Sequence, residues 1–117
     1  MGLTFIDGKV KAGASKEVSV RFLVDSGVSL TLLANEHWKE LGLTPKRTME
    51  FTLADGEVIK RNVSECYIIL PVGEGHTPVI LGEEGDTPLL GIITLEILGL
   101  KLNPFQRTLE PMKMMLA

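Results

Sequence analysis

The strongest constraint on the fold is a run of alternating apolar residues that ends in an Asp-Ser-Gly sequence. Apolar side chains occupy every second position from Val18 to Val24, and this period of two predicts a β-strand with one buried face. Asp25, Ser26 and Gly27 follow directly. A carboxylate beside a buried strand is costly unless it is paired or hydrogen-bonded, so we expect this one to have a function. The Ser26 hydroxyl can hold the carboxylate, and Gly27 permits the tight turn that presents it.

The rest of the chain predicts several more short strands joined by glycine-containing turns. Asp7-Gly8 predicts a hairpin turn, because Asp-Gly favours the positive φ angles of a type I′ turn. Residues 48–53 alternate again, and residues 54–57 predict the turn that leads into the second strand of a hairpin. The Gly-Glu-Gly sequence at residues 73–75 predicts a further turn between two apolar strands.

Two short helices are expected between the strands. Asn35 can cap a helix that ends at Gly42, and residues 94–98 predict a second helix that Gly99 can end in a left-handed conformation. A last strand is expected at residues 100–103. Many short strands with only one or two short helices place the chain in the mainly β class.

Length and charge limit the organisation of the chain and its partners. The 117 residues predict a single domain that spans residues 1–117. The content of 44% hydrophobic and 23% charged residues is typical of a globular protein. The net charge of −3 argues against nucleic acid as the main partner, because binding to phosphates needs a basic face.

The sequence also argues against a membrane, a metal or another cofactor. The N-terminus lacks the basic and apolar regions of a signal peptide, and the longest apolar stretch, at residues 89–100, is interrupted by glycine and polar residues. Cys66 is the single cysteine, which favours a reducing compartment, the cytoplasm. His37 and His76 have no second ligand at metal-binding spacing. We therefore expect no membrane partner, no metal and no cofactor.

Three features follow one another in a characteristic order along the chain. They are the Asp25-Ser26-Gly27 sequence, the turn at residues 54–57, and Leu89-Leu90-Gly91 ahead of a short helix. Together they resemble the retroviral-type (retropepsin-like, clan AA) aspartic proteases, and more closely the cellular prokaryotic relatives of these enzymes. The resemblance covers roughly residues 18–104. It implies the single-domain retropepsin-like acid protease fold.

The resemblance also implies a role for each residue of the candidate site. It makes Asp25 the catalytic carboxylate, Ser26 a residue that hydrogen-bonds across a pair of such loops, and Gly27 the residue that leaves room for the substrate backbone. Gly91 has no Cβ, so the active-site loop can pack closely against the strand that ends at Leu90. The flap and substrate-binding residues that the resemblance implies are Ala54, Asp55, Gly56, Glu57 and Val28.

One aspartate of this kind per chain implies a homodimer. The chemistry needs two carboxylates that share one proton, and no second Asp-hydroxyl-Gly sequence occurs. The nearest sequence, Asp86-Thr87-Pro88, has proline where the turn needs glycine. We therefore expect the second Asp25 to come from another chain in a two-fold dimer. Retroviral members brace this loop with an Asp–Arg ion pair, and this brace is missing because uncharged residues hold its positions: Ser29 to Thr31 and Ile92 or Ile93.

The sequence therefore predicts an aspartic endopeptidase that hydrolyses peptide or protein substrates as a homodimer. The alternative is a catalytically silent member of the same fold that serves as a dimerisation or peptide-binding module. The intact Asp25-Ser26-Gly27 sequence favours the enzyme, because a binding module has no reason to keep a costly carboxylate.

Overall fold

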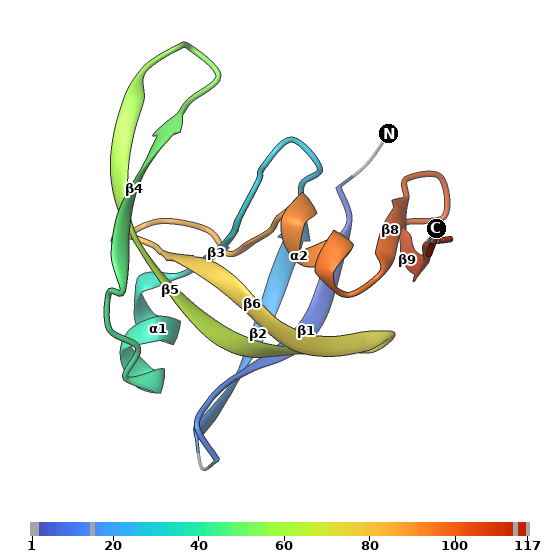
Figure 1. Cartoon of the computed structure of the whole chain (residues 1–117), viewed down its shortest axis with the longest axis horizontal. Coiled ribbons are helices and arrows are strands. Elements are labelled where there is room, and N and C mark those ends of the chain that lie inside the picture. Colours follow the sequence, from blue (N-terminus) through green and yellow to red (C-terminus); the bar gives the residue numbers. More distant parts are fainter. Residues whose placement is uncertain (1–2, 15, 114, 117) are drawn as a thin grey trace.

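The computed structural model describes residues 3–14, 16–113 and 115–116 of the chain. Within them the chain folds into short strands and two short helices, arranged as shown in Figure 1. The elements in chain order are β1 (Phe5–Ala12), β2 (Lys16–Val24), β3 (Thr31–Leu33), α1 (Asn35–Leu41), β4 (Arg47–Thr52), β5 (Val58–Leu70), β6 (Gly73–Leu81), β7 (Leu89–Leu90), α2 (Ile92–Ile97), β8 (Leu100–Asn103) and β9 (Thr108–Pro111).

Seven of the strands form one sheet, in the order β1-β2-β7-β3-β6-β5-β4. β1 also pairs with β5, so six strands close into a ring and β4 lies outside it. Most neighbouring strands are antiparallel, but β7 runs parallel to β2 and β6 runs parallel to β3. β8 and β9 form a separate antiparallel pair. The mainly β, single-domain class predicted from the sequence is confirmed, with two short helices.

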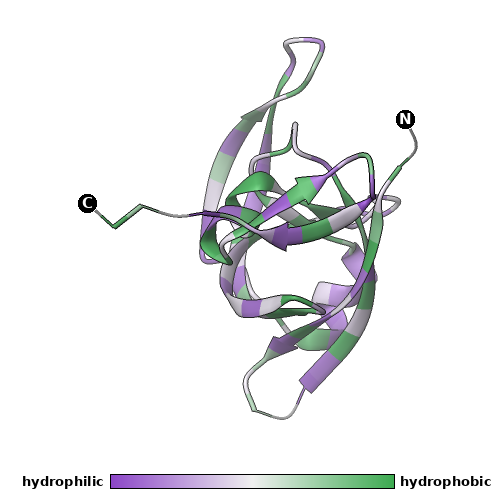
Figure 2. Cartoon of the chain, turned by 90° about the vertical axis from the view of Figure 1, so that its right-hand side faces the viewer, coloured by the Kyte–Doolittle hydropathy of each residue, from purple (hydrophilic) through white to green (hydrophobic). Residues whose placement is uncertain are grey.

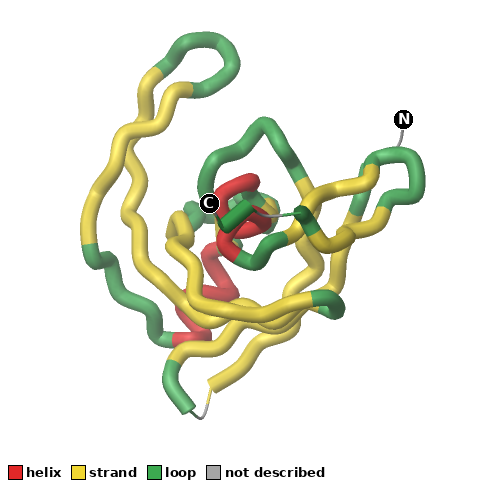
Figure 3. Tube along the Cα trace, turned by 45° about the vertical axis from the view of Figure 1, so that its right-hand side comes forward, coloured by secondary structure: helices red, strands yellow, loops and turns green. Residues whose placement is uncertain are grey.

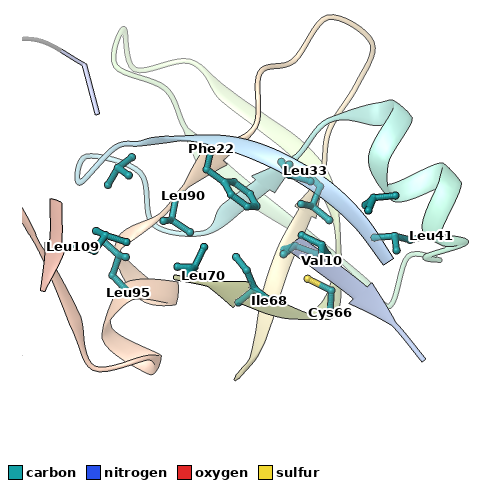
Figure 4. Close-up of a cluster of buried hydrophobic side chains, with 14 of the residues drawn as sticks. Val10, Phe22, Leu33, Leu41, Cys66, Ile68, Leu70, Leu90, Leu95 and Leu109 are labelled. Atoms are coloured by element: carbon teal, nitrogen blue, oxygen red, sulfur yellow. The ribbon is translucent and has the colours of Figure 1, made fainter. Parts of the chain in front are cut away.

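The main core lies inside this ring, and the alternating strand predicted from the sequence supplies one wall of it. Phe22 of β2 is fully buried, and the other apolar residues of the alternation are buried with it. Figure 4 shows Phe22, Leu33, Ile68 and Leu90 pointing toward one another from four different strands. Each fully buried side chain of this size contributes about 1.5–3 kcal/mol. Figure 2 shows the matching pattern of hydrophobic and hydrophilic residues interleaved along the strands.

The hairpin turn expected at Asp7-Gly8 is wrong. Both residues lie inside β1, which pairs with β2 along its whole length. A Cβ built on Gly8 would come within 2.9 Å of the Ile69 carbonyl oxygen. Gly8 is therefore needed where β1 crosses closely over β5, and not for a turn.

The turn expected at residues 73–75 is wrong as well. β6 already begins at Gly73, and Pro71 and Val72 form the turn between β5 and β6. A Cβ built on Gly75 would come within 3.0 Å of the Leu98 side chain. This glycine therefore permits β6 to pack closely against the segment that follows α2.

The two helices begin at other residues than predicted, and α2 ends at Ile97, one residue before the predicted Leu98. α1 starts at Asn35 itself, and the capping position belongs to Ala34, which makes no side-chain cap hydrogen bond. α2 starts at Ile92, two residues earlier than expected. Gly42 and Gly99 follow the helices with left-handed φ angles of 74° and 69°.

The chain continues past the last predicted strand into one more strand, β9. β9 folds back antiparallel onto β8, and its Leu109 is buried against the main core. Sequence reasoning missed β9 because Leu109 is its single aliphatic residue, too little for a detectable alternation. In the part of the chain that the structure describes, no helix has both the length and the apolar character needed to cross a membrane.

Candidate active site

Asp25 lies where β2 ends and the chain turns sharply. Its backbone N–H donates to the Leu90 carbonyl oxygen at 3.1 Å, and its own carbonyl oxygen accepts from the Val28 N–H at 3.2 Å. The carboxylate Oδ1 accepts a hydrogen bond of 2.9 Å from the backbone N–H of Gly27. The side chain is half-buried. These bonds fix both the backbone and one carboxylate oxygen of Asp25, so the turn presents the other oxygen.

The neighbours of Asp25 differ in part from the prediction. Ser26 and Gly27 are both exposed at the surface of the turn. The sequence predicts that the Ser26 hydroxyl holds the carboxylate, but the donor within the described chain is the Gly27 backbone. Val28, the expected substrate-facing residue, is half-buried beside them.

The segment formed by β7 and the start of α2 packs against this loop and forms hydrogen bonds with it. The N–H groups of Ile92 and Ile93 donate to the carbonyl oxygens of Val28 and Ser29, at 2.9 Å and 3.0 Å. A Cβ built on Gly91 would come within 2.6 Å of the Ser29 carbonyl oxygen, and glycine is the residue that avoids this clash. Leu90, directly before it, is fully buried. The close packing that Leu90 and Gly91 were expected to permit is thus present in the geometry.

Three buried threonine hydroxyl groups add a second support that the sequence analysis missed. The Oγ1 atom of Thr94 in α2 lies 2.6 Å from that of Thr31 in β3 and 2.7 Å from that of Thr77 in β6. Thr31 Oγ1 also accepts the N–H of Gly91 at 3.1 Å. All three side chains are at most 2% exposed. A hydroxyl network therefore lies in the region where the resemblance to retroviral proteases would place an ion-pair brace.

The β4–β5 hairpin contains the other predicted site residues. Its tip, residues 54–57, is exposed, and Gly56 has a left-handed φ of 89°. The tip is closed by hydrogen bonds from Leu53 N–H to Glu57 O at 2.7 Å and from Glu57 N–H to Asp55 Oδ1 at 2.8 Å. Figures 1 and 3 show the hairpin tip and the Asp25 loop projecting from the same side of the molecule.

A second, smaller apolar cluster connects the β4–β5 hairpin with the end of the Asp25 loop. Leu30, from the end of the loop, is buried together with Val63 of β5 and Ile80 of β6. Partly buried apolar side chains pack against these three: Leu32, Met49 and Phe51. The base of the hairpin therefore presents an apolar inner surface next to the Asp25 loop.

The described residues offer neither a metal site nor a cysteine nucleophile. Among them, no group of three His, Cys, Asp or Glu side chains lies close enough together to hold a metal ion. Cys66 is buried in β5, and burial, with a smaller contribution from the charge of Glu65, raises the pKa of its thiol to about 12. The thiol is therefore protonated at neutral pH and acts as a small core residue.

The fold and the Asp25-Ser26-Gly27 turn together define a domain of the aspartyl protease class. The sequence profile of the family described as aspartyl protease matches residues 6–91. The chain therefore belongs to the aspartyl protease family. No curated protein sequence gives a significant match.

Two solved viral structures are similar to this chain in fold. The solution structure of simian foamy virus (mac) protease has a TM-score of 0.57 and 15% sequence identity, over 79% of this chain and 91% of that chain. The crystal structure of prototype foamy virus protease-reverse transcriptase has a TM-score of 0.55 and 14% identity, over 97% of this chain and 12% of that much longer chain. At these identities the likeness is one of fold, and the fold is that of the retroviral proteases.

Proposed function

We propose that this protein is an aspartic endopeptidase that acts as a homodimer, with one Asp25 from each subunit. The observation that carries the proposal is the Asp25 turn, which is held by Leu90 on one side and by Gly27 on the other. Belonging to the aspartyl protease family supports the same reading. Each chain supplies one such turn, and two-fold symmetry would supply the second with identical geometry.

The proposed reaction uses the two carboxylates in different protonation states. Like charges this close cannot both be ionised, so the pair shares one proton. The ionised carboxylate takes a proton from water while the water oxygen bonds to the peptide carbonyl carbon. The protonated carboxylate gives its proton to the carbonyl oxygen. The first carboxylate, now protonated, then gives its proton to the amide nitrogen, and the C–N bond breaks. The second carboxylate takes a proton from a hydroxyl of the tetrahedral intermediate, which leaves an acid and an amine and restores the shared proton.

The β4–β5 hairpin would serve as the flap over the substrate. A peptide would add as an extended strand between the hairpin and the Asp25 loop, with alternate side chains facing the two walls. Ala54, Asp55, Gly56 and Glu57 at the tip would close over it and exclude water, and Val28 would contact it from below. The exposed position of the tip supports this role.

The proposed dimer is supported by apolar side chains exposed near the Asp25 loop. Leu3 is 65% exposed and lies next to Thr4, whose carbonyl oxygen accepts the N–H of Val24. Ile93 and Ile97 of α2 are also exposed. A standard interface of about 1,200–2,000 Å² would cover such side chains, and Ser26 would hydrogen-bond across the two loops within it.

The lone cysteine supports a place of action in the cytoplasm. Cys66 is buried and has no partner cysteine in the sequence. The fold of this chain therefore does not depend on a disulfide, as expected of a protein that works in a reducing compartment.

Incubation of the purified protein with an unfolded protein substrate at a series of pH values tests the proposal. We expect cleavage at acidic pH with a decline on both sides of the optimum. Asp25→Asn should abolish cleavage without disturbing the fold. Asp7→Asn, a matched change of an exposed aspartate in β1, should leave cleavage unchanged. Cleavage that survives in Asp25→Asn would contradict the proposal. A folded protein that binds peptides without cleaving them would instead be the silent binding module.

A further inference from the structure

The inner face of the β4–β5 hairpin places one charged side chain beside its apolar surface. Arg61 is two residues before Val63 on β5, so both side chains lie on the same face of the strand. Val63 is buried with Leu30 and Ile80 in the smaller apolar cluster. Arg61 is also paired in register with Met49 of β4, which packs against that cluster. Arg61 therefore has apolar neighbours on both strands.

The Arg61 guanidinium pairs with a carboxylate from another part of the chain. Its Nη2 lies 3.5 Å from Glu83 Oε1, and its Nη1 donates to the Lys60 carbonyl oxygen at 3.0 Å. The Arg61 side chain is 22% exposed and that of Glu83 is 66% exposed. Of the four ion pairs among the described residues, this is the one whose basic side chain is mostly buried.

Glu83 belongs to the loop of residues 82–86, which follows β6 and is fixed by hydrogen bonds between Glu83 and Asp86. The Glu83 N–H donates to Asp86 Oδ2 at 2.7 Å, and the Asp86 N–H donates to the Glu83 carbonyl oxygen at 3.0 Å. A Cβ on Gly82 would meet Leu32 of the apolar surface at 3.0 Å. The chain then continues into β7, which pairs with the end of β2 at Val24. The ion pair therefore joins the hairpin to a loop that adjoins Leu32 of the apolar surface and leads into the strand paired with the end of β2.

We propose that Arg61 is a specificity-determining residue that exchanges Glu83 for a carboxylate side chain of the substrate. The substrate would carry an Asp or Glu close to a large apolar residue, which packs on Leu32, Met49 and Phe51. This inference rests on the proposed peptide-binding function of the site. It adds the class of sequence that the site selects.

The exposures of the two partners favour this exchange. An ion pair with an exposed partner contributes little to stability, and Glu83 can return to water at small cost. The guanidinium keeps a compensating charge throughout, and its planar group of N–H donors suits a bidentate carboxylate. A basic substrate residue that captured Glu83 would leave the mostly buried Arg61 side chain without a carboxylate partner, which is costly.

A set of matched peptides tests the inference. Each peptide has one large apolar residue, and Glu, Gln or Lys is placed in turn at each of the three positions on either side. We expect at one position a preference for Glu over Gln of about fivefold in kcat/KM. Arg61→Gln should remove the preference and Arg61→Lys should keep part of it. Glu83→Gln, which frees the guanidinium, should increase it. Lys60→Gln removes the adjacent outward charge and should leave the preference unchanged.

The same peptides are also measured for binding to the Asp25→Asn protein, so that selectivity and catalysis are read separately. Selective binding through Arg61 without any cleavage would support the inference and reject the peptidase. Cleavage without a preference, or with one that Arg61→Gln leaves intact, would overturn the inference and keep the peptidase. A preference for Lys would assign recognition to the acidic loop and overturn it as well. Neither cleavage nor binding would overturn both. If Arg61→Gln fails to fold, Arg61→Lys and Glu83→Gln decide the result.

Discussion

The Asp25 loop and the tip of the β4–β5 hairpin are both exposed turns, but they are supported in opposite ways. The Asp25 loop is held from outside, by backbone hydrogen bonds to Leu90, Ile92 and Ile93. The hairpin tip is held from within, because its hydrogen bonds join Leu53 to Glu57 and other residues of the same turn. Opening the tip therefore breaks only its own bonds, whereas moving the Asp25 loop disturbs the core. A site that needs a fixed carboxylate and a movable cover would be built in this way.

The largest expected effect on the fixed region comes from Gly91→Ala. The new Cβ would lie 2.6 Å from the Ser29 carbonyl oxygen and from the Leu30 backbone, so the loop or α2 must move. We expect a loss of about 3 kcal/mol or more in the free energy of unfolding, measured by urea denaturation.

The matched change at the hairpin tip is Gly56→Ala. A Cβ at Gly56 meets no atom of the described residues within 4 Å, although the φ of 89° is unfavourable for alanine. We expect a loss of about 1 kcal/mol from backbone strain alone. Equal losses at the two glycines would contradict the contrast between the two regions.

An effect between those of the two glycine substitutions is expected from Thr94→Val, which keeps the shape of the side chain and removes its hydroxyl. The bonds of 2.6 Å and 2.7 Å to Thr31 and Thr77 would be lost inside the core. We expect a loss of about 1–3 kcal/mol in the free energy of unfolding, together with a lower kcat. Thr48→Val on the hairpin, where an exposed hydroxyl bonds Asn62 at 3.1 Å, should change stability by about 0.5 kcal/mol or less.

Cys66 reports on the fixed core without a substitution. Because burial raises the pKa of the folded thiol from 9.0 to about 12, the native protein should react very slowly with a thiol reagent at about pH 8, and at the normal rate in urea. The stability linked to this thiol is fully present below about pH 9 and declines as the pH rises toward 12, because only the unfolded chain releases the proton. Rapid reaction of the native protein would show that β5 opens readily.

The smallest effect on stability and a clear effect on catalysis are expected from Asp55→Ala. The change removes the 2.8 Å hydrogen bond to the Glu57 N–H at the tip, so the tip loses its local order. We expect the free energy of unfolding to change by about 0.5 kcal/mol or less, while kcat/KM falls severalfold. A variant with normal kcat/KM would argue against a role of the tip in closing over substrate.

The sequence predicted elements well where local residues determine them. The alternation in β2, the glycine after each helix and the turn at residues 54–57 depend on near neighbours, and the structure has them. Gly8 and Gly75 were interpreted as turn residues, because a turn and a close crossing of strands both require glycine. The sequence does not say which strand passes over a given glycine.

The candidate site also has features that the sequence predicts and features that only the fold reveals. The Asp25 turn could be predicted, because its three residues are adjacent in the sequence. The hydroxyl network could not, because Thr31, Thr77 and Thr94 come from three elements that only the fold brings together. A threonine within an otherwise apolar segment was the available signal, and it does not name a partner. The ion pair of Arg61 with Glu83 was hidden for the same reason.

Subunit mixing tests the central claim, that each chain supplies half of one active site. Wild-type protein is allowed to exchange subunits with a threefold excess of Asp25→Asn, and cleavage is measured at a constant amount of wild-type chain. If an active site needs Asp25 from both chains, random pairing lowers the activity per wild-type chain to about a quarter. The same excess of an unrelated protein should have no effect. Activity that stays unchanged after complete exchange would contradict the shared site.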